Sequence, residues 1–453
     1  MSGLRDKLLR MRTSAAAQAE RLAGMVTEES TEQVEPEVAL DEMEVSAEPA
    51  AVEEPNVLSA DWQELNVRVV ESTEGSFLVR ESRYPLMHRH GIHQLAELEH
   101  TQLHLDVFRK QEQTQPDYTN MLFLDLETTG LGVGTGNVPF MVGLAYLQED
   151  VFVVEQMLIR HPAEERAMIG YLCNLLPSFT HLVTYNGRTF DWPVLHNRFI
   201  LNGFRSFSWE PIHVDLLHPS RSIWRNTLVS CRLSHVEEER LGITRDDDVP
   251  GSQAPAIYFQ YLADGNPQPL LGVFEHNEID MLSLAVLAIR FGHLLGGGLG
   301  EHVAMPSEAE ELLRTGLWLE RMGKTELAEP LYALLVDHPR IPHKCLCLLA
   351  ERDKKCGNWE RAVLLWQKAV QDAEAAKRPD YEAHIELAMY YEHRTKELQA
   401  ALSLAEEAHS IALRRHAGLR LQNKQRTELE LIRKRIDRLI GKLQRWNRIE
   451  HTQ

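Results

Sequence analysis

One short apolar stretch that is interrupted by two carboxylates constrains the fold of this chain most. It runs from Met121 to Leu131 with the sequence MLFLDLETTGL, and its first four residues predict a buried strand. Asp125 and Glu127 interrupt the strand two residues apart. Because side chains alternate along a strand, both carboxylates are expected on one face, about 7 Å apart along the chain. Adjacent buried acids repel each other, and a hard cation such as Mg²⁺ or Mn²⁺ would offset this repulsion.

The four residues that follow the second acid favour a phosphate-binding turn. Thr128 and Thr129 supply small polar side chains, and Gly130 leaves its backbone accessible to a bound phosphate. Leu131 is expected to be exposed and to pack against a base. These residues argue against the alternative, in which the strand simply reaches solvent with two surface acids.

A second motif, YNGRTFDWPVL, runs from Tyr185 to Leu195 after a short apolar strand. Asn186 is expected to end that strand and Phe190 to be buried. Asp191 then stands at the start of a helix with an apolar face. Taken alone, this position favours a simple helix N-cap for Asp191.

A third motif, EHNEIDMLSL, begins at Glu275. His276 and Asp280 are four residues apart, which places them on one face of a helix. The opposite face predicts a core stripe of Met281, Leu282, Leu284, Leu287 and Ile289. A histidine on a helix is more often a packed or surface residue than a catalyst, so the order of the three motifs carries this argument.

The segment DLETTGL, together with the other two motifs, resembles the DEDD exonucleases of the ribonuclease H-like superfamily, which includes the proofreading domains of DNA polymerases. The resemblance implies an α/β domain with a mixed central sheet flanked by helices. It also implies that two Mg²⁺ or Mn²⁺ ions support phosphodiester hydrolysis, with His276 as the general base. The implied metal ligands are Asp125, Glu127, Asp191 and Asp280. The residues expected at the substrate are Thr128, Thr129, Gly130, Leu131, Asn186, Phe190 and Asp215.

The spacing of the third motif departs from the family pattern. The histidine subclass usually has four residues between histidine and aspartate, whereas His276 and Asp280 are separated by three, the spacing of the tyrosine subclass. A different histidine, or metal-activated water alone, can therefore take the role of His276. Asp215 is expected to order Arg221 or the substrate strand and not to bind metal. The acidic loop from Asp246 to Gly251 is expected to be a solvated turn.

The formal net charge of −19 argues against a nucleic-acid substrate until its distribution is considered. Residues 22–60 contain eleven Asp or Glu and no Lys or Arg, so this segment alone contributes −11. Its composition predicts a disordered linker. Residues 1–25 fit either a short basic amphipathic helix or a frayed tail.

These patterns divide the chain into five regions. We predict a disordered acidic segment over 1–60 and an N-terminal extension over 61–118 that packs on the nuclease domain. The ribonuclease H-like domain is expected over 119–297. A glycine-rich hinge over 298–305 and a helical domain over 306–453 follow.

The helical domain shows the spacing of tetratricopeptide-like repeats. Gly323 and Gly357 are 34 residues apart, which is the period of that repeat. A degenerate third unit follows an insertion around Arg378-Pro379. The matching positions are Gly316, Gly323, Ala328 and Tyr332, then Ala350, Gly357, Ala362, Trp366 and Ala369, then Ala401, Ala405 and Ala408. A plain helical bundle is the alternative.

Two basic regions have both a structural and a functional interpretation. From Arg414 onward, twelve basic residues stand against four acidic ones, which suits a solvated capping helix or a phosphate-binding face. A second basic group surrounds Tyr84-Pro85 and consists of Arg80, Arg83, His88, Arg89, His90 and His93. It fits an ordinary surface loop, or a cationic loop that contacts the phosphate backbone.

Cysteine usage and apolar runs bound the cellular context. The five cysteines form no zinc pattern and are expected to be reduced core thiols, although Cys345, Cys347 and Cys356 offer a second interpretation as metal ligands. There is no run of 18 apolar residues, and the N-terminus lacks the apolar core of a signal peptide. We therefore expect a cytoplasmic protein without a membrane partner.

The arrangement of the three motifs ahead of helical repeats resembles the bacterial YprB-type predicted exonucleases. It implies a metal-dependent 3′-5′ exonuclease that acts on single-stranded ends of DNA or RNA. Two other classes stay open. One is a nucleic-acid-binding protein with a weak catalytic site, and the other is a scaffold that recruits a protein partner through its repeats.

Overall fold

The computed structural model describes residues 58–109, 120–130, 132, 134, 136–246, 248–375, 380–416 and 422–450. Most of the acidic segment predicted to be disordered, and the basic residues before it, therefore lie outside the described residues. The same holds for Leu131 and for the insertion around Arg378-Pro379.

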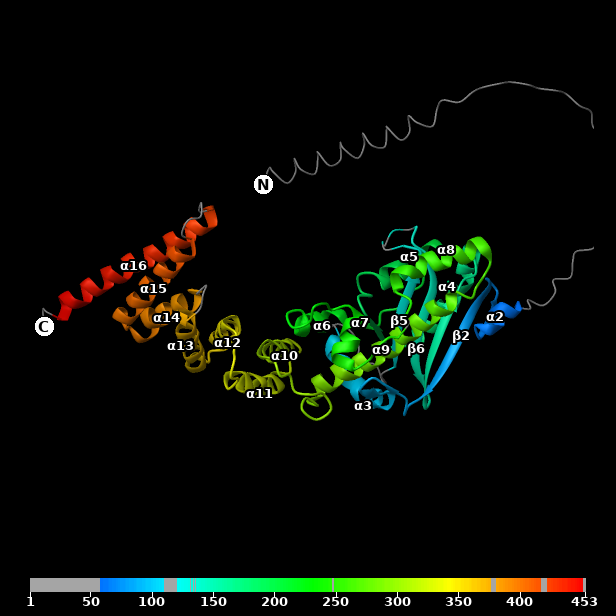
Figure 1. Cartoon of the computed structure of the whole chain (residues 1–453), viewed down its shortest axis with the longest axis horizontal. Coiled ribbons are helices and arrows are strands. Elements are labelled where there is room, and N and C mark those ends of the chain that lie inside the picture. Colours follow the sequence, from blue (N-terminus) through cyan, green and yellow to red (C-terminus); the bar gives the residue numbers. More distant parts are fainter. Residues whose placement is uncertain are drawn as a thin grey trace, which may run out of the picture. The chain divides into compact units, whose positions relative to one another are not determined.

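A seven-stranded mixed sheet organises the first part of the described chain, in the order β1-β2-β7-β6-β5-β8-β9. Figure 1 labels β2, β5 and β6 of this sheet. Neighbours from β1 to β5 in this order pair antiparallel, and β5, β8 and β9 pair parallel. The strands are β1 (Val67–Ser72), β2 (Gly75–Pro85), β5 (Met121–Thr128), β6 (Pro139–Gln148), β7 (Val151–Leu158), β8 (His181–Thr184) and β9 (Ile212–Asp215). The predicted mixed sheet with flanking helices is confirmed.

Alternation along β5 separates two cores. Met121 and Phe123 pack in one core with residues of α9 (Leu270–Gly296), while Leu122 and Leu124 pack in the other with α4 (Glu165–Leu175) and α5 (Asp191–Leu201). Since Asp125 and Glu127 continue the odd-numbered series, they belong to the face covered by α9. The remaining elements of this part are α6 (Leu217–Trp224), α7 (Leu233–Val236), α8 (Ala254–Asp264), and the short turns η3 (Pro162–Glu164), η4 (Leu176–Ser178), η5 (Glu237–Leu241) and η6 (Gly251–Gln253).

The segment predicted as an N-terminal extension contributes directly to the central sheet. Its strand β2 pairs with β7 along eight residues, from Leu78 opposite Leu158 to Pro85 opposite Val151. A small hairpin and a helical stretch then pack against α9. These elements are β3 (Arg89–His90), β4 (His93–Gln94), η1 (Leu95–Glu97), α3 (Leu98–Thr101) and η2 (Gln102–Phe108), whereas α2 (Ala60–Glu64) precedes β1 and contacts it.

Helix α9 is the main core helix. It is long and apolar enough to cross a membrane by composition, but 83% of its most apolar 18-residue window is buried within the protein. Packing against β5, β6 and β7 accounts for this apolar surface. The third motif lies in its first half, and the second half carries two further ionisable residues, Arg290 and His293.

The chain after α9 is helical, as predicted. Successive helices pack in neighbouring pairs, α10 with α11, α12 with α13 and α14 with α15, and α16 then packs on α15. The bounds are α10 (Ala309–Arg321), α11 (Thr325–Val336), α12 (His343–Lys355), α13 (Trp359–Ala375), α14 (Glu382–Tyr390), η7 (Tyr391–Thr395), α15 (Leu398–His416) and α16 (Asn423–Glu450). On α16, Ile432 and Leu439 are buried, so this helix has an inward apolar face.

The connection between the two parts is tightly folded, and its role as a hinge stays a prediction. Gly298 accepts hydrogen bonds from His302 and Val303, and the side chain of Val303 is buried. Beyond the loop, Glu311 of α10 accepts a hydrogen bond from Trp224 Nε1 at 2.9 Å. Helix α10 therefore shares its core with α6 and α9.

Candidate active site

Asp125 and Glu127 lie on β5 beneath the polar first half of α9. Glu127 is 7% exposed, and Asp125 is half-buried. Burial is the main cause that raises the pKa of both carboxyls, and the charges of Asp280 and Asp191 raise it further. For Glu127 the pKa reaches about 8. Burial and the neighbouring acids therefore disfavour ionisation of both carboxyls unless a cation offsets the charge.

The orientation of Asp125 depends on an asparagine that the three motifs gave no reason to expect there. Asn277 Nδ2 donates to Asp125 Oδ2 at 3.2 Å, and Asn277 Oδ1 accepts from Gln156 Nε2 at 3.0 Å. Gly143 lies opposite both Asp125 and Gln156 in the sheet. A Cβ atom on Gly143 would lie 2.1 Å from Asn277 Oδ1. Glycine is therefore required at this position, beneath the hydrogen bonds that Asn277 makes with Asp125 and Gln156.

Asp191 begins α5 and joins the same group of carboxylates. Its side chain is 4% exposed and accepts a hydrogen bond from the backbone N–H of Leu126, which lies between the two acids of β5. Burial raises its pKa to about 7, and the charges of Asp215 and Asp280 contribute. A role as a simple helix cap therefore does not explain why other acidic side chains lie close to Asp191.

Asp280 comes from α9 and is paired with an arginine that sequence reasoning missed. Arg245 donates to Asp280 Oδ1, and it also donates to both oxygens of Glu237 at 2.6 and 2.7 Å. The Glu237 side chain is fully buried. This guanidinium supplies a positive charge beside the carboxylates.

The four carboxylates interact electrostatically without forming a tight ligand set. Among the described residues, the group of three whose ligand atoms all lie within 4.8 Å of one another is a different one, formed by His93, Glu97 and His293. The counter-charge of Asp280 in this arrangement is the Arg245 guanidinium, with which it forms an ion pair. A compact shell would require Asp280 to exchange Arg245 for a cation.

His276 has a carboxylate partner in the loop that we predicted to be a solvated turn. That prediction is wrong for Asp248, which is 17% exposed and has both oxygens 2.9 Å from His276 Nδ1. On its other side, His276 Nε2 lies 3.6 Å from Asp280 Oδ2, as the four-residue spacing predicts. Only the packing of the loop on α9 brings Asp248 to His276, so local sequence gives no signal for it.

The residues expected to bind a phosphate stabilise their own turn. Thr128 Oγ1 donates to the carbonyl of Gly130 at 2.7 Å, and Thr129 Oγ1 accepts from the backbone of Val138 at 3.0 Å. Leu131 lies outside the described residues. These hydrogen bonds hold the turn from within, and Gly130 itself is half-buried.

The second motif is supported by Asp215. This buried carboxylate accepts backbone N–H donors from Asn186, Arg188 and Leu217 at 2.9, 3.1 and 3.1 Å. Asn186 has a positive φ of 72° and an exposed side chain. Asp215 therefore orders the backbone of the second motif and not, as we expected, Arg221. Phe190, which we expected to be buried, is half-buried.

The basic group around Tyr84-Pro85 does not form one cationic surface. Arg80 pairs with Glu278 at 3.2 Å. His90 contacts Ser283 on α9 at 2.9 Å, and burial lowers its pKa to about 4. His93 is buried, and burial lowers its pKa too. The interpretation as a phosphate-binding loop is therefore wrong for these three residues.

Comparison with known proteins assigns this site to a class. Residues 122–291 match the model of the RNase_H superfamily, and they contain all three motifs. The first part of the described chain is thus a ribonuclease H-like domain, a fold often found in nucleases. The chain is also 35% identical over 363 residues to "Uncharacterized protein YprB" of Bacillus subtilis (strain 168), an alignment that covers 78% of this chain and 85% of that protein. The chain belongs to the YprB family.

Proposed function

We propose that this protein is a metal-dependent nuclease, in particular a 3′-5′ exonuclease for single-stranded ends of DNA or RNA. The observation that carries the proposal is the gathering of four carboxylates on β5, α5 and α9, in which burial and the charge of Asp280 raise the pKa of Asp125, Glu127 and Asp191. Such an arrangement is unfavourable for stability and is common at functional sites.

The donor set fits divalent cations. Asp125, Glu127, Asp191 and Asp280 supply only oxygen ligands, which suit Mg²⁺ or Mn²⁺. When bound, two such ions would lower the pKa of the attacking water and neutralise charge on the phosphate and the leaving oxygen. Arg245 already supplies a positive charge to Asp280, which supports the interpretation that this carboxylate requires a counter-charge.

The contacts of His276 support a role as general base. Asp248 accepts a hydrogen bond from Nδ1 and thereby favours the tautomer in which Nε2 is free to accept a proton. That nitrogen faces Asp280, so it lies on the side of the carboxylates. The unusual spacing of the third motif is then compatible with a histidine base, because the loop partner fixes the ring.

The proposal is tested with end-labelled single- and double-stranded DNA and RNA, with and without Mn²⁺. We expect stepwise release of 5′-mononucleotides from a free 3′ end. Asp125→Asn and Asp280→Asn should each lower the rate at least about 1000-fold while circular dichroism stays unchanged. Glu275→Gln, an exposed residue of the same helix, is the matched control and should keep full activity. Full activity in either aspartate variant would exclude this site.

We further propose that the helical part consists of tetratricopeptide-like repeats that recruit a nucleic acid or a protein partner. Gly323, Gly357 and Lys396 have φ of 77°, 82° and 66°, and each lies in the turn before the second helix of a pair. Ala328 and Ala362 are fully buried at the same distance after the first two of these turns, as close helix packing requires.

Exposed basic residues on α16 support contact with phosphates. Lys424, Arg426 and Arg433 are exposed, whereas Arg435, Arg438 and Lys442 pair with the buried Glu392. Replacing the three exposed residues by glutamate in the full chain should weaken single-strand binding and flatten its salt dependence. Unchanged salt dependence would leave a protein partner as the remaining role of the repeats.

A further inference from the structure

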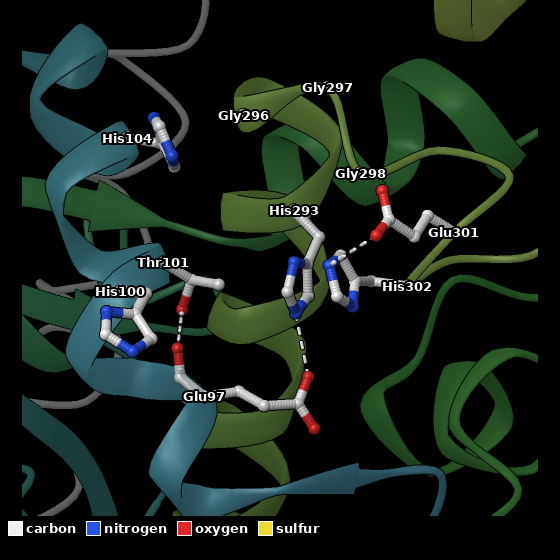
Figure 2. A pocket seen from close by; sticks show the side chains of 10 residues that line it. All are labelled: Glu97, His100, Thr101, His104, His293, Gly296, Gly297, Gly298, Glu301 and His302. Atoms are coloured by element: carbon white, nitrogen blue, oxygen red, sulfur yellow. Dashed lines mark hydrogen bonds and ion pairs between the residues drawn. The ribbon is translucent and has the colours of Figure 1, made fainter.

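A second cluster of metal-ligating side chains lies near the far end of α9, away from the carboxylates. It joins His93 of β4, Glu97 of η1 and His293 of α9. Figure 2 shows Glu97 and His293 approaching each other from their separate elements, beside His302 and a glycine-rich turn. None of these residues takes part in the proposed nuclease chemistry.

The three side chains converge on one point. Glu97 Oε2 lies 2.9 Å from His93 Nδ1 and 2.7 Å from His293 Nε2. One ligand atom from each residue lies within 4.8 Å of both others. Two imidazole nitrogens that share one carboxylate oxygen are disposed as they would be around a small cation.

The cluster is held in place by the surrounding structure. Glu97 Oε1 accepts the backbone N–H of Gln94 at 2.7 Å, which fixes the carboxylate and leaves Oε2 for the histidines. His93 is 2% exposed, and its Nε2 has no hydrogen-bond partner within the described part of the chain.

The cluster borders a cavity with room for a further ligand. The cavity has a volume of about 340 Å³ and is lined by Glu97, His293 and His302, among others. Gly296, Gly297 and Gly298 form one wall, which therefore lacks side chains (Figure 2). His302 stacks on His293 with ring centroids 4.4 Å apart.

From this convergence we infer that His93, Glu97 and His293 form a Zn²⁺ site, with its fourth position open to the cavity. Two imidazoles and one carboxylate suit zinc, whereas Mg²⁺ prefers oxygen ligands alone. Zinc–ligand bonds of about 2.0–2.2 Å in a tetrahedron separate the ligand atoms by roughly 3.3 Å. The contacts of 2.7 and 2.9 Å to Glu97 lie slightly below this separation, and the two imidazole nitrogens lie within 4.8 Å of each other.

Such an ion would tie the β3–β4 hairpin to the end of α9, next to the turn that leads into the helical part. In the metal-free protein, the hydrogen bonds to Glu97 make the same connection more weakly. The site therefore has a structural role available to it, and its open position also allows binding of an anion or water.

The test is a Zn²⁺ titration of the full-length protein in excess Mg²⁺, which saturates the carboxylate site. Bound zinc is counted by mass spectrometry after gel filtration, and X-ray absorption of the zinc-loaded wild type reports its ligands. We expect one zinc per chain with two imidazole ligands. Glu97→Gln and His93→Ala should each weaken zinc binding at least about 100-fold.

Two control variants show whether zinc binds at this cluster or elsewhere on the chain. His104→Ala, which alters the same cavity without removing a proposed ligand, should keep zinc affinity unchanged. Asp125→Asn should keep the zinc as well, since its effect is confined to the carboxylates. Absence of bound zinc in the wild type, or loss of zinc in Asp125→Asn with retention in Glu97→Gln, would overturn the assignment. If the ligand variants fail to fold, the absorption spectrum of the wild type still decides.

Discussion

The metal-free protein should become more stable when Glu127 is replaced by glutamine, although the proposed activity is lost. Glu127 has an ordinary pKa of 4.5 when exposed and about 8 in the folded protein, mainly because it is buried. The folded state therefore binds more protons than the unfolded state between these two values, and stability falls as pH rises through this window. Below pH 4.5 the carboxyl is protonated in both states and carries no such cost.

The size of the effect follows from the part of that window that lies below neutral pH. The two pKa values differ by about 3.5 pH units, and pH 7 lies about 2.5 units above the lower one. At about 1.36 kcal/mol per unit, keeping Glu127 buried at pH 7 costs roughly 3 kcal/mol. The buried amide of glutamine loses about 1 kcal/mol of that gain through imperfect hydrogen bonding. We expect Glu127→Gln to stabilise the metal-free protein by about 2 kcal/mol.

The assay is urea unfolding in EDTA, followed by tryptophan fluorescence, at pH 4.5, 7 and 8. At pH 4.5, where little of the ionisation cost remains, Glu127→Gln should be less stable than the wild type by up to about 1 kcal/mol, and its advantage should be largest at pH 8. Mn²⁺ should stabilise the wild type more than the variant. Glu275→Gln, at an exposed position, should change stability by less than about 0.5 kcal/mol at every pH. An advantage that is equal at pH 4.5 and pH 8, or a variant that is less stable at pH 8, would refute the reasoning.

Three further predictions concern single contacts. Gly143→Ala places a methyl group against Asn277 and should cost about 1–3 kcal/mol in urea unfolding, with a parallel loss of nuclease rate; a neutral result would contradict the contact. Asp248→Asn should lower kcat about 10- to 100-fold at unchanged KM by freeing the ring of His276, and an unaltered kcat would remove Asp248 from the mechanism. Burial raises the pKa of Glu392, but hydrogen bonds from its basic partners lower it to about 2, so its stabilisation is present above pH 4.5 and lost towards pH 2. Glu392→Gln should therefore cost about 1–2 kcal/mol at neutral pH, allowing for solvent screening, and nothing near pH 2, where equal costs would argue against the ion pairs.

The family resemblance implied the mixed sheet, and sequence periodicity was sufficient to place the motif residues on their elements. Alternation put Asp125 and Glu127 on one strand face, and the four-residue interval put His276 beside Asp280. Helix α8 was not predicted, because the acidic loop before it carried no clear start signal. The paired helices after α9 followed from the spacing of small residues.

Contacts between distant segments could not be predicted in the same way. Arg245 and Asp248 reach the site from a loop about 30 residues before the third motif, and their partners are set by how that loop packs on α9. The interpretation of Arg80, His90 and His93 as phosphate contacts failed for the same reason. A basic residue in the sequence is exposed only if the fold does not pair it with a buried acid. Arg80 is paired in this way with Glu278.

Helix α9 carries residues of both the carboxylate cluster and the cluster of His93, Glu97 and His293. Asp280 and His293 belong to the same uninterrupted helix, thirteen residues and roughly 20 Å apart at 1.5 Å per residue. Their relative direction is therefore fixed by helical phase. Inserting one residue between them would turn one cluster about 100° away from the other, so the length of this interval is as much a constraint on the chain as the identity of its side chains.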